Sequence, residues 1–144
     1  MRRRTLLAAC ALAACSRKQP TGAALPAGSS VLALGDSITF GTGADSAAAY
    51  PSQLAALTGW NVTNAGVPGD TAAQAVERLP ALLAEHQPAL VIVSAGGNDF
   101  LRRLPTAETE AALRTAIGLA RDAGAQVLLV AVPQPSIGAA LGAG

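Results

Sequence analysis

Three short, glycine-rich polar loops hold the residue types that acyl-transfer chemistry requires. Their sequences are GDSIT at residues 35–39, GVPGDT at residues 66–71 and GGND at residues 96–99. Ser37 supplies a hydroxyl that can act as a nucleophile, and Asn98 supplies a carboxamide N–H donor. Glycine lets main-chain N–H groups approach a ligand closely, and several such donors can stabilise an oxyanion. The loops therefore supply the parts that acyl transfer needs for a nucleophile and an oxyanion hole.

The segments before these loops indicate how the loops are positioned. Residues 31–34, 89–93 and 127–132 are unbroken apolar runs of the kind found in strands buried on both faces. Residues 60–64 alternate apolar and polar side chains, as an edge strand does. Helices are predicted at residues 51–58, in the stretch that follows a capping box formed by Thr71 and Gln74, and at residues 107–123, the two longer ones from apolar residues at helical spacing.

The resulting order, β-α-β-α-β-α-β, predicts an α/β fold in which helices cover both faces of a doubly wound parallel sheet. The carboxyl ends of parallel strands meet at one edge of such a sheet, which is where ligands bind. All three loops should therefore open on the same edge.

Composition excludes several classes of function. The chain has 144 residues, of which 51% are hydrophobic and 13% charged, and its formal net charge is +1. It is long enough for one domain and too apolar to be intrinsically disordered. Four aromatic residues and a near-neutral charge provide neither the stacking platform nor the basic stripe of a nucleic-acid-binding protein. One histidine and two cysteines offer no metal site, so we expect no cofactor or metal.

The N-terminus has the pattern of a secretory signal. Three arginines at positions 2–4 precede a short apolar stretch that ends in Leu-Ala-Ala before Cys15. This stretch is too short to cross a bilayer, which needs about 20 apolar residues. The pattern resembles a bacterial lipobox, whereas the alternative is an ordinary signal peptide with an incidental cysteine. We expect residues 1–14 to be the signal, Cys15 to carry lipid, residues 15–29 to form a tether, and residues 30–144 to form the domain. The protein would then be anchored in the bacterial cell envelope, facing the periplasm or the exterior.

At these motifs the chain resembles the SGNH hydrolases, also called the GDSL esterase/lipase family. Gly-Asp-Ser at 35–37 matches the family's first block, Gly69 its second, and Gly-Asn-Asp at 97–99 its third. The flanking residues resemble the branch of periplasmic thioesterases, lysophospholipases and arylesterases. The resemblance implies a flavodoxin-like three-layer fold and acyl ester or thioester substrates. It also implies that Ser37 is the nucleophile, and that the oxyanion hole consists of the Ser37 and Gly69 N–H groups and the Asn98 side chain.

The family's Asp-x-x-His block, which supplies the catalytic base near the C-terminus, is absent from this sequence. The only histidine, His86, precedes the third strand and should lie at the opposite sheet edge, about 20 Å from Ser37. We therefore expect a family member that is incomplete on its C-terminal side and weakly active or inactive. Asp36, Asp70 and Asp99 are expected to brace the loops rather than to catalyse.

Two other functions remain open at this point. The crevice expected where the three loops open, at the carboxyl ends of the strands, could hold acyl or glycan ligands without catalysis. Alternatively, the glycine-rich loops could bind phosphate or a nucleotide, although the chain has neither Gly-x-Gly-x-x-Gly nor Gly-Lys-Ser/Thr.

Overall fold

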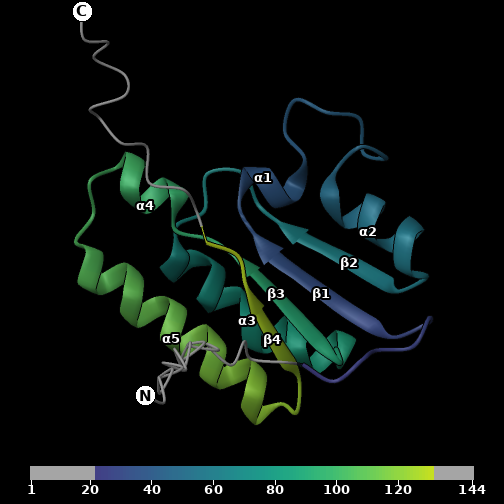
Figure 1. The fold of residues 1–144 in the computed structure, drawn as a ribbon. Helices are drawn as coiled ribbons and strands as arrows, with labels where there is room; N and C mark the ends of the chain where they lie inside the picture. Colours follow the sequence, from purple (N-terminus) through teal and green to yellow (C-terminus); the bar gives the residue numbers. More distant parts are fainter. Residues whose placement is uncertain (1–21, 132–144) are drawn as a thin grey trace, which may run out of the picture.

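The computed structural model describes residues 22–131, which form a four-stranded parallel sheet with helices packed against it (Figure 1). The strand order is β2-β1-β3-β4. The strands are β1 (Ser30–Gly35), β2 (Asn61–Gly66), β3 (Leu90–Ser94) and β4 (Gln126–Leu129). The helices are α1 (Ser37–Phe40), α2 (Tyr50–Thr58), α3 (Ala72–His86), α4 (Gly97–Leu101) and α5 (Thr106–Asp122). This architecture confirms the predicted α/β fold. The signal and Cys15 lie outside the described residues.

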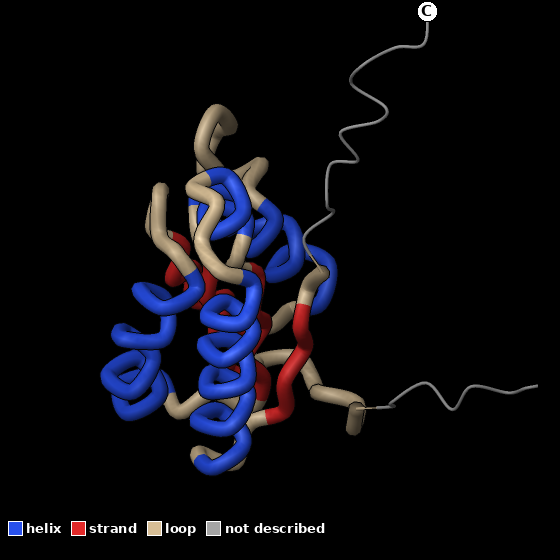
Figure 2. The backbone as a smooth tube through the Cα atoms, turned by 90° about the vertical axis from the view of Figure 1, so that its left-hand side faces the viewer, coloured by secondary structure: helices blue, strands red, loops and turns tan. Residues whose placement is uncertain are grey.

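The core lies between the sheet and helices α3 and α5, which pack side by side on one face (Figure 2). α2 lies toward the other face, beside β2 (Figure 1). Alternate residues of β1 point to opposite faces, yet all of residues 31–34 are fully buried. This burial explains why β1 is an unbroken apolar run, as predicted for a strand covered on both sides. The side chains buried between the sheet and α3 and α5 include Leu32, Leu34, Leu79, Val91 and Val93.

The sheet register brings the three loops to one edge, as predicted. Gly35, the last residue of β1, pairs with Gly66 at the end of β2 and with Ser94 at the end of β3. Three neighbouring strands therefore end at the same level. The loop or helix that follows each of them starts from this edge, which we call the carboxyl edge of the sheet.

The first and third of these segments are short helices rather than the open loops expected from the sequence. α1 starts directly after β1, and the Asp36 side chain accepts a hydrogen bond of 3.0 Å from the Ile38 N–H at its first turn. α4 follows Gly96, which has a φ of +111° that side-chain-bearing residues rarely adopt. Helices of four or five residues are too short to show an apolar period, so the pattern could not predict them.

The outer strands have one neighbour each among residues 22–131. β2 is an edge strand, as its alternating pattern predicted. β4 is the other edge and ends at Leu129, whereas the apolar run suggested a strand up to residue 132, which lies outside the described part. Leu128, Leu129 and Val130 are each at least two-fifths exposed, so the prediction that this run is buried on both faces is wrong for its described part, where β4 has a neighbour on one side only.

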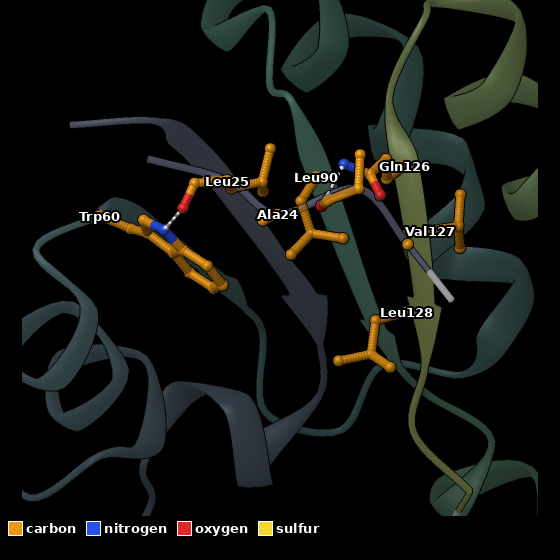
Figure 3. Close-up of a pocket in the computed structure, with 9 residues that line it drawn as sticks. Ala24, Leu25, Trp60, Leu90, Gln126, Val127 and Leu128 are labelled. Atoms are coloured by element: carbon orange, nitrogen blue, oxygen red, sulfur yellow. Dashed lines mark hydrogen bonds between the residues drawn. The ribbon is translucent and has the colours of Figure 1, made fainter. Parts of the chain in front are cut away.

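Residues 22–29, which belong to the expected tether, lie against the amino edge of the sheet. The Gln126 side chain donates to the Ala23 carbonyl (3.1 Å), and the Trp60 indole donates to the Leu25 carbonyl (3.3 Å). A cavity of about 290 Å³ lies between this segment and β3 and β4 (Figure 3). None of the helices within residues 22–131 combines the length and hydropathy that crossing a bilayer requires.

Candidate active site

Ser37 lies at a tight turn between β1 and α1. A Cβ atom at Gly35 would lie 2.6 Å from the Ser94 carbonyl oxygen and would also overlap the Thr39 side chain, so only glycine allows this turn. The Asp36 carboxylate is buried and caps α1. Ser37 itself is partly exposed at the carboxyl edge. A strand-to-helix turn of this kind presents a nucleophile to substrate.

The second loop carries Gly69 and is held by two arginines. The loop leaves β2 beside β1, where the Val67 N–H donates to the Gly35 carbonyl (3.0 Å). Gly69 has a φ of +85°, and its carbonyl accepts a hydrogen bond of 2.6 Å from the Arg102 side chain. Asp70 forms an ion pair with Arg78, with 2.8 Å between the guanidinium nitrogen and the carboxylate oxygen. The loop is therefore fixed by α3 on one side and by the residues after α4 on the other.

Asn98, on α4, links the third segment to the second loop. Its Nδ2 atom donates to the Asp70 carbonyl at 2.9 Å. An amide nitrogen carries two hydrogens, so this bond orients the carboxamide and leaves a second hydrogen for a ligand. Next to it, the buried Asp99 carboxylate accepts from the Ala72 N–H (2.8 Å) and from the Thr109 hydroxyl (3.0 Å). Asp99 thereby joins the start of α3 to the start of α5.

Several main-chain donors at the carboxyl edge remain free, and two of them belong to predicted site residues. The N–H groups of Ser37 and Gly69 pair with no acceptor within residues 22–131. The structure thus leaves free the two N–H groups that the sequence analysis assigned to an oxyanion hole. Such donors, already oriented by the fold, stabilise the negative charge of a tetrahedral acyl-transfer intermediate.

All three loop aspartates make bracing contacts of the kind that the sequence predicted. Asp36 caps α1, Asp70 pairs with Arg78, and Asp99 accepts two hydrogen bonds. Within residues 22–131, no three His, Cys, Asp or Glu side chains cluster as a metal site requires.

His86 lies at the opposite edge of the sheet, as predicted. Its carbonyl accepts a hydrogen bond of 3.0 Å from the hydroxyl of Ser30, the first residue of β1, whereas Ser37 follows the last residue of that strand. Six strand residues span about 20 Å. The imidazole is therefore far beyond the hydrogen-bond reach that a general base for Ser37 needs.

Apolar side chains surround the candidate site and remain exposed. Phe40 is 54% exposed and Phe100 is 43% exposed, so neither is a core residue. We call the exposed apolar residues of α1, the second loop and α4 the apolar rim; they are Ile38, Phe40, Val67, Phe100 and Leu101. Their position at the carboxyl edge suits contact with an apolar part of a ligand.

Arg78 and Arg102 were not singled out by the sequence analysis. Arg78 falls on the polar side of the apolar pattern of α3, where a charged residue is ordinarily a solvent contact. Its partner Asp70 precedes the helix and lies eight positions earlier, so no i,i+4 spacing links the two residues. Nothing in the sequence predicts the bond from Arg102 to a main-chain carbonyl.

Sequence comparison relates the chain to known proteins. Residues 33–143 match the GDSL-like Lipase/Acylhydrolase family. The chain is 39% identical over 114 residues to Esterase TesA of Pseudomonas aeruginosa, and 40% identical over 114 residues to Thioesterase 1/protease 1/lysophospholipase L1 of Escherichia coli. Each match covers 76% of this chain, but 57% and 54% of those relatives respectively.

Solved structures show the same fold. The SGNH-hydrolase family esterase AlinE4 is similar with a TM-score of 0.72 and 32% identity, over 78% of this chain and 63% of that protein. A crystal structure of TesA has a TM-score of 0.71 and 39% identity, over 74% of this chain and 62% of that protein. The chain spans just over half the length of the curated relatives it matches. On its motifs, its fold and these similarities, the chain belongs to the GDSL-like lipase/acylhydrolase family, the SGNH hydrolases.

Proposed function

We propose that this chain performs acyl transfer from esters or thioesters, with Ser37 as the nucleophile. The Ser37 Oγ attacks the acyl carbonyl carbon, and the carbonyl oxygen becomes an oxyanion. That oxyanion accepts hydrogen bonds from the Ser37 N–H, the Gly69 N–H and the Asn98 carboxamide. Collapse of the intermediate breaks the bond to the alcohol or thiol and leaves an acyl-serine, which water then hydrolyses.

One observation carries this proposal: strands β1, β2 and β3 end in register, and the residues that follow them present a hydroxyl, two free N–H groups and an oriented carboxamide. A phosphate-binding site would also use free N–H groups, but the chain has neither Gly-x-Gly-x-x-Gly nor Gly-Lys-Ser/Thr. The apolar rim favours substrates with an apolar acyl group.

The hydroxyl proton of Ser37 needs an acceptor, and the only imidazole among the 144 residues lies at the wrong edge. Loss of the base in a serine hydrolase lowers turnover by about 10⁶, and roughly 10³ to 10⁴ over water remains from binding and the oxyanion hole. We therefore expect these 144 residues alone to be weakly active, and an imidazole added from solution to restore part of the missing proton transfer.

The test is covalent labelling of Ser37 by a fluorophosphonate in increasing concentrations of free imidazole. The adduct is measured by intact mass and located by peptide mapping, so that ester hydrolysis by imidazole itself does not interfere. Labelling should occur at Ser37, and its rate should rise with the concentration of neutral imidazole. Ser37→Ala should abolish the adduct.

Ser52→Ala is the matched control. Ser52 lies on α2, where its exposed hydroxyl donates to the Ser46 carbonyl (2.7 Å), so this variant should label at the wild-type rate. Absence of an adduct at Ser37 at every imidazole concentration would overturn the catalytic proposal. Binding of an acyl ligand without labelling would then identify a non-catalytic binding protein.

We also propose that lipid on Cys15 anchors the protein in the bacterial cell envelope. The supporting features are the three N-terminal arginines, the short apolar stretch and the small residues directly before the cysteine. Metabolic labelling with a palmitate analogue should modify the wild type, and the label should co-fractionate with membranes. Cys15→Ser should lose the label, whereas Cys10→Ser should retain it. An unlabelled wild-type protein would refute the anchor.

A further inference from the structure

We propose that Arg78 is a positioning residue that holds the second loop, which carries Gly69, in register with β1, the strand that leads to Ser37. This inference rests on the proposed function of Ser37 and Gly69. The Arg78 guanidinium donates to the Asp70 carboxylate through Nε (3.0 Å) and Nη2 (2.8 Å). It also donates to the Ala65 carbonyl through Nη1 and Nη2 (3.2 Å each), and Nη2 reaches the Gly35 carbonyl at 3.5 Å.

These three partners belong to three separate parts of the candidate site. Gly35 ends β1 two residues before Ser37. Ala65 is the last residue but one of β2, and Asp70 directly follows Gly69. The guanidinium therefore joins β1, the strand that leads to Ser37, to the loop that carries the Gly69 N–H. Its anchor is α3, which packs into the core through Leu79, the next residue along the chain.

The second loop depends on such anchoring because it has little regular structure of its own. Its internal main-chain hydrogen bond runs from the Asp70 N–H to the Val67 carbonyl at 3.2 Å. Asn98 holds the Asp70 carbonyl from the opposite side, and Arg102 holds the Gly69 carbonyl. Arg78 and the Val67 N–H, which donates to the Gly35 carbonyl at 3.0 Å, together tie the loop to β1, and so to Ser37.

The chemistry of arginine suits this role. A guanidinium is planar and carries five N–H groups, so it can serve a carboxylate and two carbonyls at once. A lysine ammonium keeps the charge but has one nitrogen, and it cannot reproduce the fork. Methionine keeps much of the length and loses every donor, which leaves the mostly buried Asp70 carboxylate without its partner. Arg78→Lys and Arg78→Met therefore separate charge from geometry.

The experiment measures labelling of Ser37 and local hydrogen exchange in the same variants. At saturating probe and imidazole, the labelling rate of Arg78→Met should fall about 100-fold, since a displacement of about 1 Å has an effect of that order. The probe concentration that gives half-maximal rate should change little, because four of the five apolar-rim residues lie on α1 and α4, outside the loosened loop. The labelling rate of Arg78→Lys should lie between those of Arg78→Met and the wild type.

Amide exchange in residues 66–71 should become faster in Arg78→Met, while exchange in β3 and α5 should stay at the wild-type rate. Arg114→Met is the matched control, because Arg114 forms an exposed i,i+4 pair with Glu110 on α5. It removes the same charge and should leave both labelling and loop exchange unchanged.

Each outcome decides between the alternatives. Arg78→Met that labels at the wild-type rate would refute the positioning role while the proposed function stands. Faster exchange throughout the sheet, together with slower labelling, would show that Arg78 acts through global stability and would equally refute it. If wild-type Ser37 does not react at any imidazole concentration, the proposed function is wrong and the positioning role falls with it.

Discussion

Replacing Gly66 by alanine should damage the candidate site through the backbone of α1. A Cβ atom at Gly66 would lie 2.2 Å from the Phe40 nitrogen, 2.7 Å from the Thr39 carbonyl carbon and 2.8 Å from the Asp36 carbonyl oxygen. All three atoms are main chain, so no side-chain rotation can relieve the overlap. Either α1 or the end of β2 must move by roughly an ångström to restore normal contacts.

The size of the effect follows from that displacement. Forcing an extra carbon into a packed region costs about 1 to 3 kcal/mol of unfolding free energy. Ser37 is the first residue of α1, so moving this helix also moves the nucleophile relative to Gly69 and Asn98. A misplacement of about 1 Å at a reacting group can lower a rate by about 100-fold. Gly66→Ala should therefore lose both stability and Ser37 labelling.

Urea unfolding and fluorophosphonate labelling would measure the two effects, with Gly118→Ala as the control. Gly118 lies in α5, and a Cβ atom there would meet nothing within 4 Å. Alanine should stabilise that helix by about 0.5 to 1 kcal/mol and leave labelling unchanged. The two glycine replacements thus have opposite predicted signs. A Gly66→Ala protein as stable and as reactive as the wild type would show that the close approach of α1 to β2 does not set the site.

Three further changes test other parts of the structure. Asn98→Ala should slow Ser37 labelling by about 10² to 10³-fold through loss of one oxyanion donor, and labelling kinetics that stay unchanged would remove Asn98 from the site. Leu79→Ala, at a fully buried core position, should lower the unfolding free energy by about 2 to 5 kcal/mol in urea, and a loss below about 1 kcal/mol would contradict the assigned core. Burial raises the pKa of Tyr50 above 10.0; the Thr39 hydrogen bond lowers it and the charge of Asp36 raises it further. The stability that Tyr50 contributes is therefore complete below pH 10 and is lost as the pH rises through the raised pKa. Tyr50→Phe should remove that part of the decline in a pH series of unfolding free energies, and an identical decline in both proteins would refute the shift.

The sheet and the common edge of the loops were predictable because burial leaves a direct trace in the sequence. β1 and β3 are covered on both faces, which requires apolar residues at every position, and β2 alternates because it is an edge. The positions of the three loops then follow from parallel topology alone. The same reasoning placed His86 at the opposite edge, and its contact with Ser30 agrees.

The parts that escaped prediction depend on contacts that carry no sequence pattern. α1 and α4 are single turns stabilised by a cap and by a glycine conformation, not by an apolar stripe. Arg78 reaches main-chain carbonyls, and a carbonyl is present at every residue, so its targets cannot be read from residue types. The composition of residues 22–29 suggested a flexible tether, but Trp60 and Gln126 bind its carbonyls from distant positions.

The distribution of satisfied and free polar groups supports the assignment of the carboxyl edge as the reactive one. Among residues 22–131, every buried side-chain nitrogen and oxygen has a hydrogen-bond partner. The Ser37 and Gly69 N–H groups are main chain and lie on partly exposed residues, and the loop that carries Gly69 is held by Arg78 and Arg102. At a partly exposed edge, water can satisfy such donors and be displaced by a ligand oxygen. Because the donors are main chain, their accuracy depends on the residues that fix the loops, and substitutions at Arg78 or Asp99 should affect chemistry without contacting substrate.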